Sequence, residues 1–373
     1  RFSDHAGTAQ SLFRPTSSCG NSQRPYDSRM KSNFPSTTAF ALCITSYFAL
    51  LHSSACVGED RGREFSVAFW NVENLFDTVD DSATEGDEEF TPSADKKWTQ
   101  TRLDIKLSNL SRVICDMNDQ RGPDVLGLCE VENRHVIELL VKQLSRLKRD
   151  YGIVHQDSPS YRGIDCALIY DRSKFELKRA RFHSVPGMTT RDIVEAELSV
   201  DGHDLSVFVN HWPSRYNPAD ARITVAGVLR RRIDQLLAAN ASADFVVLGD
   251  LNDTPADPSV ARTLRATSEA EPKPGDLVNT MSKLHDDANA GTYVYKNEWF
   301  VLDHVVVSPG LLDDRGLSWV RGSTSAPRHG YQMYVPRNPD SPARPSRSYS
   351  GPIFHQSGYS DHLPVTCRIR VGK

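Results

Sequence analysis

The chain has 373 residues, of which 39% are hydrophobic and 25% are charged, so it is long enough for one large domain or two ordinary ones. Its net charge of -4 excludes a protein that coats nucleic acid through an overall positive charge, although it leaves room for a local basic groove. The composition is typical of a soluble globular protein.

The N-terminal part of the chain carries a targeting pattern. The first methionine, Met30, is followed by a lysine, an apolar stretch over 39–51 and a run of small residues. This order is typical of a secretory signal peptide, and the stretch is shorter than the roughly 20 residues of a membrane-spanning helix. We expect 1–29 to be a misassigned, disordered extension and 30–55 to be the signal peptide. The alternative is a buried or disordered N-terminal segment.

The predicted signal peptide implies an exported protein, periplasmic or extracellular, whose mature part is a single catalytic domain over 64–373. Cys56 follows the predicted cleavage site and leaves open a lipoprotein anchor, although Ser53 is not the large aliphatic residue that such anchors prefer. We expect no transmembrane span in the mature chain, and we expect a monomer. Cys129 and Cys166 lie within predicted strands and are expected to pack as small apolar side chains.

Secondary structure follows from the apolar pattern. Short apolar runs predict strands over 65–70, 124–129, 165–170, 192–200, 204–210, 244–249, 301–307 and 363–370. Apolar residues at helical spacing predict helices from about residue 99, over about 134–148 and over about 219–239. Because helices and strands do not alternate regularly, mixed sheets with helical outer layers are favoured over a doubly wound parallel sheet.

Polar residues close or follow several of these apolar runs. They are Asn71, Glu130, His211, Asp250 with Asn252, Asp303, and the pair Asp361 and His362. We interpret this set as one active site at the edge of a sheet. Because antiparallel neighbours end at opposite edges, we expect other strands, such as 165–170 and 192–200, to run between the strands that carry these residues.

Three of these residues suit a divalent metal. Glu130 and Asp361 offer hard carboxylate oxygens, which favour Mg²⁺ or Mn²⁺ over zinc. Asn71 would add an amide oxygen or orient a phosphate. A metal site at the sheet edge is the resulting prediction.

The other residues suit reaction at phosphorus. Asp250 would orient or deprotonate a water, and Asn252 would hold developing negative charge. His211 and His362 would donate hydrogen bonds to phosphoryl oxygens, with Asp303 fixing the tautomer of His362. Together with a metal, these groups predict a hydrolase of phosphate esters.

The ordered set of motifs resembles the endonuclease/exonuclease/phosphatase family, which has the fold of deoxyribonuclease I, from about Phe65 to Arg370. The segments that match its motifs are WNVENLFD, GLCEVEN, NHWPSR, GDLND, LDHVVVS and GYSDHLPV. RGIDCALIYD is similar to a strand of exported bacterial members. The chain departs from the pattern at Cys129, where glutamine is more usual, and at His304, which replaces an aromatic residue.

This resemblance implies an α/β (α+β) fold, a four-layer sandwich of two packed mixed β-sheets flanked by helices. It implies a divalent metal at Glu130, with Asn71 and Asp361 near it. It implies catalysis by the remaining motif residues, which are His211, Asp250, Asn252, Asp303 and His362. The motifs do not decide the general base, and we assign the water to Asp250 with His362 as the alternative.

Basic residues outside the motifs are candidates for substrate binding. Arg215 would contact a substrate phosphate or form a surface salt bridge, and Arg162 with Asp165 would support the site. The segment 321–357 is rich in arginine and tyrosine and precedes Asp361. Its composition suits a phosphate backbone with stacked bases, and equally a phosphosugar.

The predicted function is an exported, Mg²⁺- or Mn²⁺-dependent phosphodiesterase, with a nuclease acting on nucleic acid as the leading interpretation. One alternative is the same chemistry on phospholipid head groups or inositol phosphates, since fold does not choose the substrate. A second alternative is a catalytically inactive binding protein on the same fold, against which the intact polar set argues.

Overall fold

The structure is a computed structural model that describes residues 63–372 apart from 83, 85 and 269–271. The expected extension and signal peptide over 1–55, and Cys56, lie outside the described residues. Export and anchoring therefore stay predictions.

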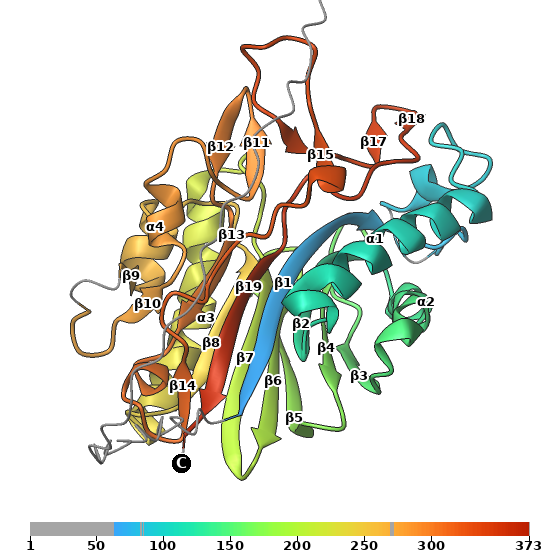
Figure 1. The fold of residues 1–373 in the computed structure, drawn as a ribbon. Helices are drawn as coiled ribbons and strands as arrows, with labels where there is room; N and C mark the ends of the chain where they lie inside the picture. Colours follow the sequence, from blue (N-terminus) through green and yellow to red (C-terminus); the bar gives the residue numbers. More distant parts are fainter. Residues whose placement is uncertain (1–62, 83, 85, 269–271, 373) are drawn as a thin grey trace, which may run out of the picture. The chain divides into compact units, whose positions relative to one another are not determined.

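Two large mixed β-sheets pack face to face at the centre of the described chain (Figure 1). The first sheet has the strand order β14 (Leu317–Trp319), β19 (Val365–Val371), β1 (Glu64–Leu75), β2 (Val125–Val131), β4 (Asp165–Asp171) and β3 (Tyr151–His155). The second has the order β5 (Glu176–His183), β6 (Ile193–Val200), β7 (His203–His211), β8 (Phe245–Asp250), β13 (Asp303–Val307), β10 (Leu277–Asn279) and β9 (Ala266–Thr267).

Helices cover the outer faces of both sheets, as Figure 1 shows. They are α1 (Gln100–Gln120) and α2 (Arg134–Gln143) on the first sheet and α3 (Ala219–Ala239) on the second, whereas the short α4 (Ser282–His285) follows β10. None of the helices in the described part of the chain has both the length and the apolar content that a bilayer crossing needs. The four layers confirm the predicted sandwich.

Short hairpins stand at one edge of the sandwich, at the top of Figure 1. They are β11 (Tyr293–Tyr295) with β12 (Glu298–Phe300), β15 (Met333–Tyr334) with β16 (Arg344–Pro345), and β17 (Tyr349–Ser350) with β18 (Ile353–Phe354). Single helical turns occur at Glu88–Phe90, Leu144–Leu147, Ser259–Leu264, Gly310–Leu312 and Gly330–Gln332.

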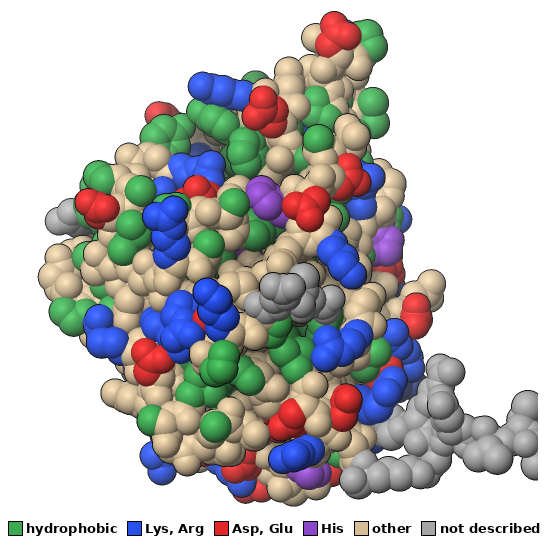
Figure 2. Space-filling model, turned by 90° about the vertical axis from the view of Figure 1, so that its left-hand side faces the viewer, with side chains coloured by type: hydrophobic (Ala, Val, Ile, Leu, Met, Phe, Trp, Pro, Cys, Tyr) green, Lys and Arg blue, Asp and Glu red, His purple; other side chains and the backbone are tan. Residues whose placement is uncertain are grey.

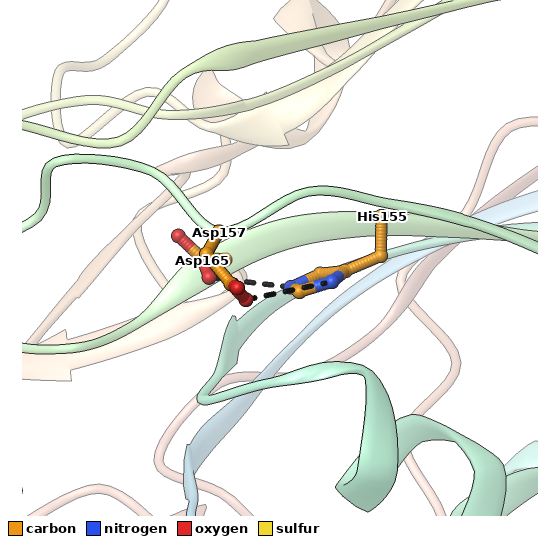
Figure 3. A group of neighbouring side chains, drawn as sticks. All are labelled: His155, Asp157 and Asp165. Carbon is orange, nitrogen blue, oxygen red and sulfur yellow. Dashed lines mark hydrogen bonds and ion pairs between the residues drawn. The ribbon is translucent and has the colours of Figure 1, made fainter. Parts of the chain in front are cut away.

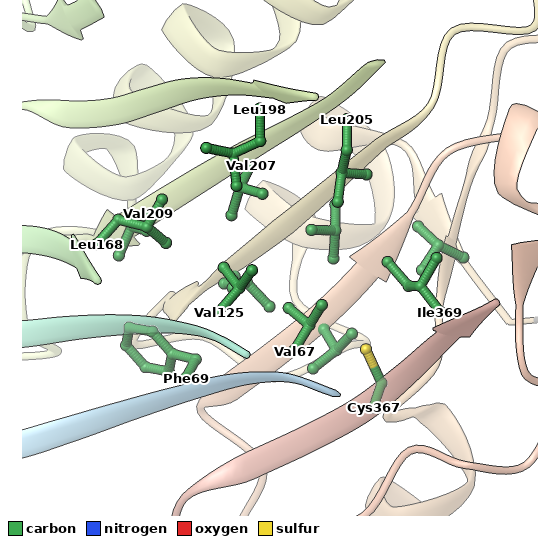
Figure 4. Close-up of a cluster of buried hydrophobic side chains, with 14 of the residues drawn as sticks. Val67, Phe69, Val125, Leu168, Leu198, Leu205, Val207, Val209, Cys367 and Ile369 are labelled. Carbon is green, nitrogen blue, oxygen red and sulfur yellow. The ribbon is translucent and has the colours of Figure 1, made fainter. Parts of the chain in front are cut away.

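Alternation along the central strand β1 divides the core into layers. Val67 and Phe69 pack between the two sheets, whereas Ala68 and Trp70 pack beneath α1 and α2. All four side chains are fully buried, because β1 is covered on both faces. Figure 4 shows the inter-sheet layer, where side chains of the first sheet meet those of β6 and β7. The sequence of β1 is therefore apolar without interruption, although alternate residues of the strand belong to two different hydrophobic layers.

The eight predicted strands and three predicted helices are present within a few residues of their expected bounds. The edge strands β3 and β5 were not predicted. β5 lacks a buried side chain, so its sequence shows no apolar run of the kind that marks a central strand.

The expectation that other strands separate the motif strands is wrong. β1 and β2 are parallel neighbours, and so are β7 and β8, so each pair ends at the same edge without a strand between them. Asp303 begins β13 instead of closing a strand, and it lies opposite Asp250 in the antiparallel register with β8. Asp361 and His362 likewise precede β19, which runs antiparallel to β1. One edge thus collects the ends of four strands and the beginnings of two.

Candidate active site

The predicted site residues meet at this edge around one cavity of about 470 Å³. Eight of them line it, namely Glu130, Arg162, His211, Arg215, Asp250, Asn252, Asp361 and His362. The other two, Asn71 and Asp303, contact Asp250 and His362 directly. The ten side chains predicted to take part in catalysis, metal binding or substrate binding therefore lie together, while their roles stay predictions.

The backbone beneath the cavity is unusual. Glu73, Asn74, Glu130 and Asn252 have φ angles of 52°, 52°, 60° and 52°, in the left-handed region that side chains other than glycine rarely adopt. Such conformations persist where the surrounding structure holds them, and they gather at functional sites. At Glu130 the conformation interrupts the register of β2 with β4 and lets the carboxylate face the cavity.

The Asp303–His362 pair predicted from the sequence is present. His362 Nδ1 lies 2.7 Å from Asp303 Oδ2, and His362 Nε2 lies 3.7 Å from Asp250 Oδ2. Burial disfavours the imidazolium, yet Asp303 and then Asp250 outweigh it and raise the pKa of His362 well above its ordinary value. His362 is therefore positively charged near neutral pH, which suits a donor to phosphoryl oxygen more than a proton acceptor.

Asp250 has the opposite character. Burial raises its pKa to about 7, with Asp303 adding to the shift and His362 opposing it. Its Oδ1 accepts the backbone N–H of Asn252 at 3.0 Å, and its Oδ2 accepts the Asn71 amide at 3.0 Å. A carboxylate with a pKa near neutrality, fixed at both oxygens, suits a general base.

His211 is held neutral. Burial lowers its pKa well below the ordinary value, and Arg191 and Arg162 lower it further. Its Nε2 lies 3.7 Å from Asp250 Oδ2, and its Nδ1 is buried without a hydrogen-bond partner among the described residues. Arg191 donates to the carbonyl oxygens of His211 and Trp212 and so fixes this end of β7.

The carboxylates fit a divalent metal. Burial favours neutral Glu130, but Arg162 and then His362 outweigh it and hold the pKa of this carboxyl below its ordinary value. Glu130 and Asp361 both face the cavity, and the Asp361 side chain is 24% exposed. Two oxygen donors beside open space match Mg²⁺ or Mn²⁺ chemistry. Asn71 presents its amide nitrogen to Glu130 at 3.4 Å, while its oxygen accepts the Glu73 N–H.

Both predicted arginines line the cavity, and both already have hydrogen-bond partners. Arg215 donates to Asp257 at 2.6 Å and to the Asn252 carbonyl at 3.0 Å, so the salt-bridge interpretation holds while its side chain still borders the cavity. Arg162 Nη1 lies 3.5 Å from Glu130 Oε1, and its side chain is 46% exposed. Arg162 Nη2 also donates to Asn74 Oδ1 at 2.6 Å, so both arginines border the cavity while they hold partners of their own.

A buried ion pair beside the site was missed by the sequence analysis. Lys106 Nζ lies 3.6 Å from Glu73 Oε2 and donates to the Ser348 hydroxyl and the Tyr359 carbonyl. Burial raises the pKa of Glu73 to about 7 and lowers the pKa of Lys106. The pair ties α1 to the chain just before Asp361. Lys106 reads as one polar residue in an amphipathic helix, so its burial carries no sequence signal.

The aromatic side of the cavity was also missed. Tyr293, Tyr295 and Phe300 of the β11–β12 hairpin line it together with Tyr216. No residue of 321–357, all of which the structure describes, lines the cavity, although Arg347 Nη2 lies 4.0 Å from Asp361 Oδ2. The expectation that 321–357 supplies the substrate contacts is therefore not supported within the cavity. The alternation in TYVYKNEWF was the available signal for the hairpin.

A second histidine–aspartate group lies at the β3–β4 edge, shown in Figure 3. His155 Nε2 lies 3.2 Å from Asp165 Oδ2, and Asp157 Oδ1 lies 3.9 Å from His155 Nδ1. Asp165 Oδ1 accepts the N–H and the hydroxyl of Ser158. Both oxygens of Asp165 are thus engaged in closing the 155–165 loop, so this residue does not contact the cavity as Arg162 does.

The sequence model of the Endonuclease/Exonuclease/phosphatase family matches residues 66–371. The chain belongs to this family, whose members hydrolyse phosphoesters and use divalent metals. The fold and the motif order described above agree with this assignment.

Similar proteins differ in what they act on. Protein angel of Drosophila melanogaster is 24% identical over 205 residues, which is 50% of this chain and 55% of the relative, so the match spans about half of each. D. rerio TDP2 complexed with a single-strand DNA product is 15% identical with a TM-score of 0.52 over 83% of this chain and 99% of that one. A mannosyl-6-phosphatase of Bacteroides thetaiotaomicron is 16% identical with a TM-score of 0.51 over 82% and 99%. These structures show the fold alone.

Proposed function

We propose that this protein is a divalent-metal-dependent phosphodiesterase that acts as a nuclease. The observation that carries the proposal is the Asp250–His362 arrangement: a buried carboxylate with a pKa of about 7 beside an imidazolium held by Asp303, both facing one cavity. A base and a cationic donor on the same side of a cavity are what hydrolysis of a phosphodiester requires.

The residues support an in-line attack. Asp250 takes a proton from a water whose oxygen bonds to phosphorus. The bond from phosphorus to the leaving oxygen breaks, and that oxygen keeps the electron pair and takes up a proton from solvent to leave as an alcohol. His362 donates from Nε2 to a phosphoryl oxygen, and Asn71 keeps Asp250 oriented through its amide. A divalent metal at Glu130 and Asp361 would neutralise charge on the phosphoryl group. The charged state of His362 favours Asp250 over His362 as the base.

Nucleic acid is the proposed substrate because the cavity combines a phosphate site with aromatic rings. The similarity in fold to D. rerio TDP2, which was crystallised with a single-strand DNA product, supports this choice. Figure 2 shows Lys, Arg, Asp and Glu side chains interspersed on one face of the molecule. With the net charge of -4, this distribution points to recognition at the cavity instead of along a broad basic surface.

A substrate comparison tests the proposal. Purified protein is incubated with single-stranded DNA, RNA, sphingomyelin, inositol phosphates and a hexose phosphate, each with Mg²⁺, with Mn²⁺ and with EDTA. We expect metal-dependent cleavage of a nucleic acid that is lost in Glu130→Ala and His362→Ala. Turnover of lipid or sugar phosphate alone would replace the nuclease proposal by the phosphatase or phospholipase alternative.

The phosphatase alternative rests on the mannosyl-6-phosphatase neighbour of similar TM-score. Both chemistries use the same metal and base, so the catalytic residues do not separate them. Contacts to the substrate outside the phosphate site therefore determine whether the enzyme acts as a phosphatase or as a nuclease.

We also propose that the protein is exported and that its catalytic domain covers 64–373, on the basis of the pattern over 30–55. Sequencing the N-terminus of the mature protein tests this. A mature chain that begins near residue 56 is expected, and one that retains 30–55 would contradict export by cleavage.

A further inference from the structure

The β11–β12 hairpin forms an aromatic wall on one side of the catalytic cavity. Tyr293 and Phe300 are cross-strand partners, and Tyr295 follows Tyr293 by two positions. Residues at such spacing face the same side of a strand, and all three line the cavity. Tyr216, on the loop after β7, borders the same cavity and is 95% exposed.

The wall begins at the reacting centre. The ring of Tyr293 lies 4.7 Å from the ring of His362, with an angle of 32° between their planes. Tyr295 lies further along the strand, by about 6.6 Å at the usual rise per residue, and is 48% exposed. Aromatic surface thus runs from the phosphate site to the mouth of the cavity.

The hairpin is rigidly attached to the catalytic residues. The Thr292 hydroxyl accepts the N–H groups of Leu302 and Asp303, and the Thr292 carbonyl accepts the N–H of Leu363. At the tip, Lys296 and Asn297 have φ angles of 48° and 67°, the two left-handed residues of a type I′ turn. The rings are therefore pre-organised relative to Asp303 and His362.

The tip offers a ring and no net charge. Glu298 lies opposite Tyr295 in the hairpin, and Lys296 Nζ lies 5.3 Å from the Tyr295 ring, so the two charges compensate. The exposed Tyr295 ring offers a flat face, which suits a planar group that stacks on an aromatic side chain.

Other substituents fit the wall less well. Among the described residues that line the cavity, Leu302 is the only aliphatic one, so an acyl chain finds no continuous apolar channel. A sugar monophosphate presents no planar group to the exposed rings of Tyr295 and Tyr216. A base next to the scissile phosphate has a flat face of the size that stacks on an aromatic side chain.

We propose that Tyr295, with Tyr216, stacks an unpaired nucleobase beside the scissile phosphate, which makes the hairpin the determinant of preference for single-stranded nucleic acid. This rests on the proposed nuclease function. A base inside a duplex has both faces covered, so only an unpaired base reaches the rings.

The test compares a single-stranded oligonucleotide with the same backbone lacking its bases. Tyr295→Ala is expected to raise KM on the base-bearing strand at least about fivefold, the lower limit for a stacked base, and to leave KM on the abasic strand unchanged. Tyr295→Phe keeps the ring and should keep the wild-type KM. Tyr334→Ala is the matched control, because Tyr334 is 49% exposed but does not line the cavity.

A binding arm separates this proposal from the proposed activity. Fluorescence anisotropy in EDTA measures Kd for both strands without cleavage. If the wild type cleaves nothing yet Tyr295→Ala weakens binding of the base-bearing strand alone, the stacking stands and the nuclease function falls. Equal losses on both strands, or no loss, or a Tyr295-dependent KM for a hexose phosphate only, would overturn the stacking.

Discussion

Two groups of one histidine and two aspartates lie in this sandwich, and their surroundings differ. Asp250, Asp303 and His362 are all buried at the edge where the cavity opens. His155 and Asp165 close a loop at the β3–β4 edge, where Asp157 is largely exposed (Figure 3). Residue type and mutual distance are alike, so neither distinguishes the two groups.

Hydrogen bonding and access distinguish them. Asp165 has partners for both carboxylate oxygens, from His155 and Ser158. In the cavity group Asp303 Oδ1 is buried without a partner among the described residues, and Asp250 and His362 face open space. The two groups therefore differ in their access to the cavity and not in residue type.

Replacing Asp250, the proposed general base, should have the largest effect. Asp250→Asn keeps the shape but removes the proton acceptor, so kcat should fall by about 10²–10⁴-fold. Asp165→Asn in the other group should change kcat by less than about twofold, within the range of a neutral change away from the chemistry. Steady-state kinetics on the substrate of the wild type measures both. Comparable losses in the two variants would erase the distinction between the groups.

The second largest effect is expected from acid, which should lower the catalytic activity that depends on Asp250. The pKa of Asp250 is about 7, raised mainly by burial, and the proposed base would act only when deprotonated. Activity should therefore fall about tenfold for each pH unit below about 7, while His362 stays charged because its pKa is raised. A pH profile of kcat/KM checks this. A rate that stays flat down to about pH 4 would contradict a carboxylate base or metal ligand.

A third prediction compares Glu130 with Glu132, two glutamates of the same motif, in their effect on metal binding. Glu130→Gln should raise the Mg²⁺ or Mn²⁺ concentration for half-maximal activity at least about tenfold, since a neutral amide is a poorer ligand. Glu132→Gln is the control, because Glu132 lies two residues away and accepts the Asp77 N–H instead of lining the cavity. Metal titration of both variants after EDTA treatment gives the measurement. Equal shifts would mean that Glu130 is not a ligand.

The smallest effect is expected from a substitution in the second group, which consists of His155, Asp157 and Asp165. His155→Gln removes one hydrogen bond to Asp165 and should lower the free energy of unfolding by about 1 kcal/mol, with activity unchanged. Urea denaturation of the two proteins measures the difference. A loss of activity with intact folding would instead link this edge to the cavity.

Much of the site was predictable from local sequence. The alternation and length of apolar runs predicted the central strands and helices, and the ends of the runs marked Asn71, Glu130, His211 and Asp250. The pattern correctly predicted that these residues meet at one edge of a sheet, but the predicted strand arrangement that would bring them together was wrong. Strand pairing depends on contacts far apart in the chain, so the parallel pairing of β1 with β2 and of β7 with β8 left no local signal.

The sequence by itself determined the four-layer class, the ordered motifs and therefore the bond that the site is built to break. Only the tertiary structure decided the protonation states of Asp250 and His362, because the pKa of each residue depends on its burial and on the charge of the other. It also replaced the 321–357 segment with the Tyr293–Phe300 hairpin as the wall of the cavity. Composition marks residues able to bind a substrate, whereas position relative to the reacting atoms decides which of them do.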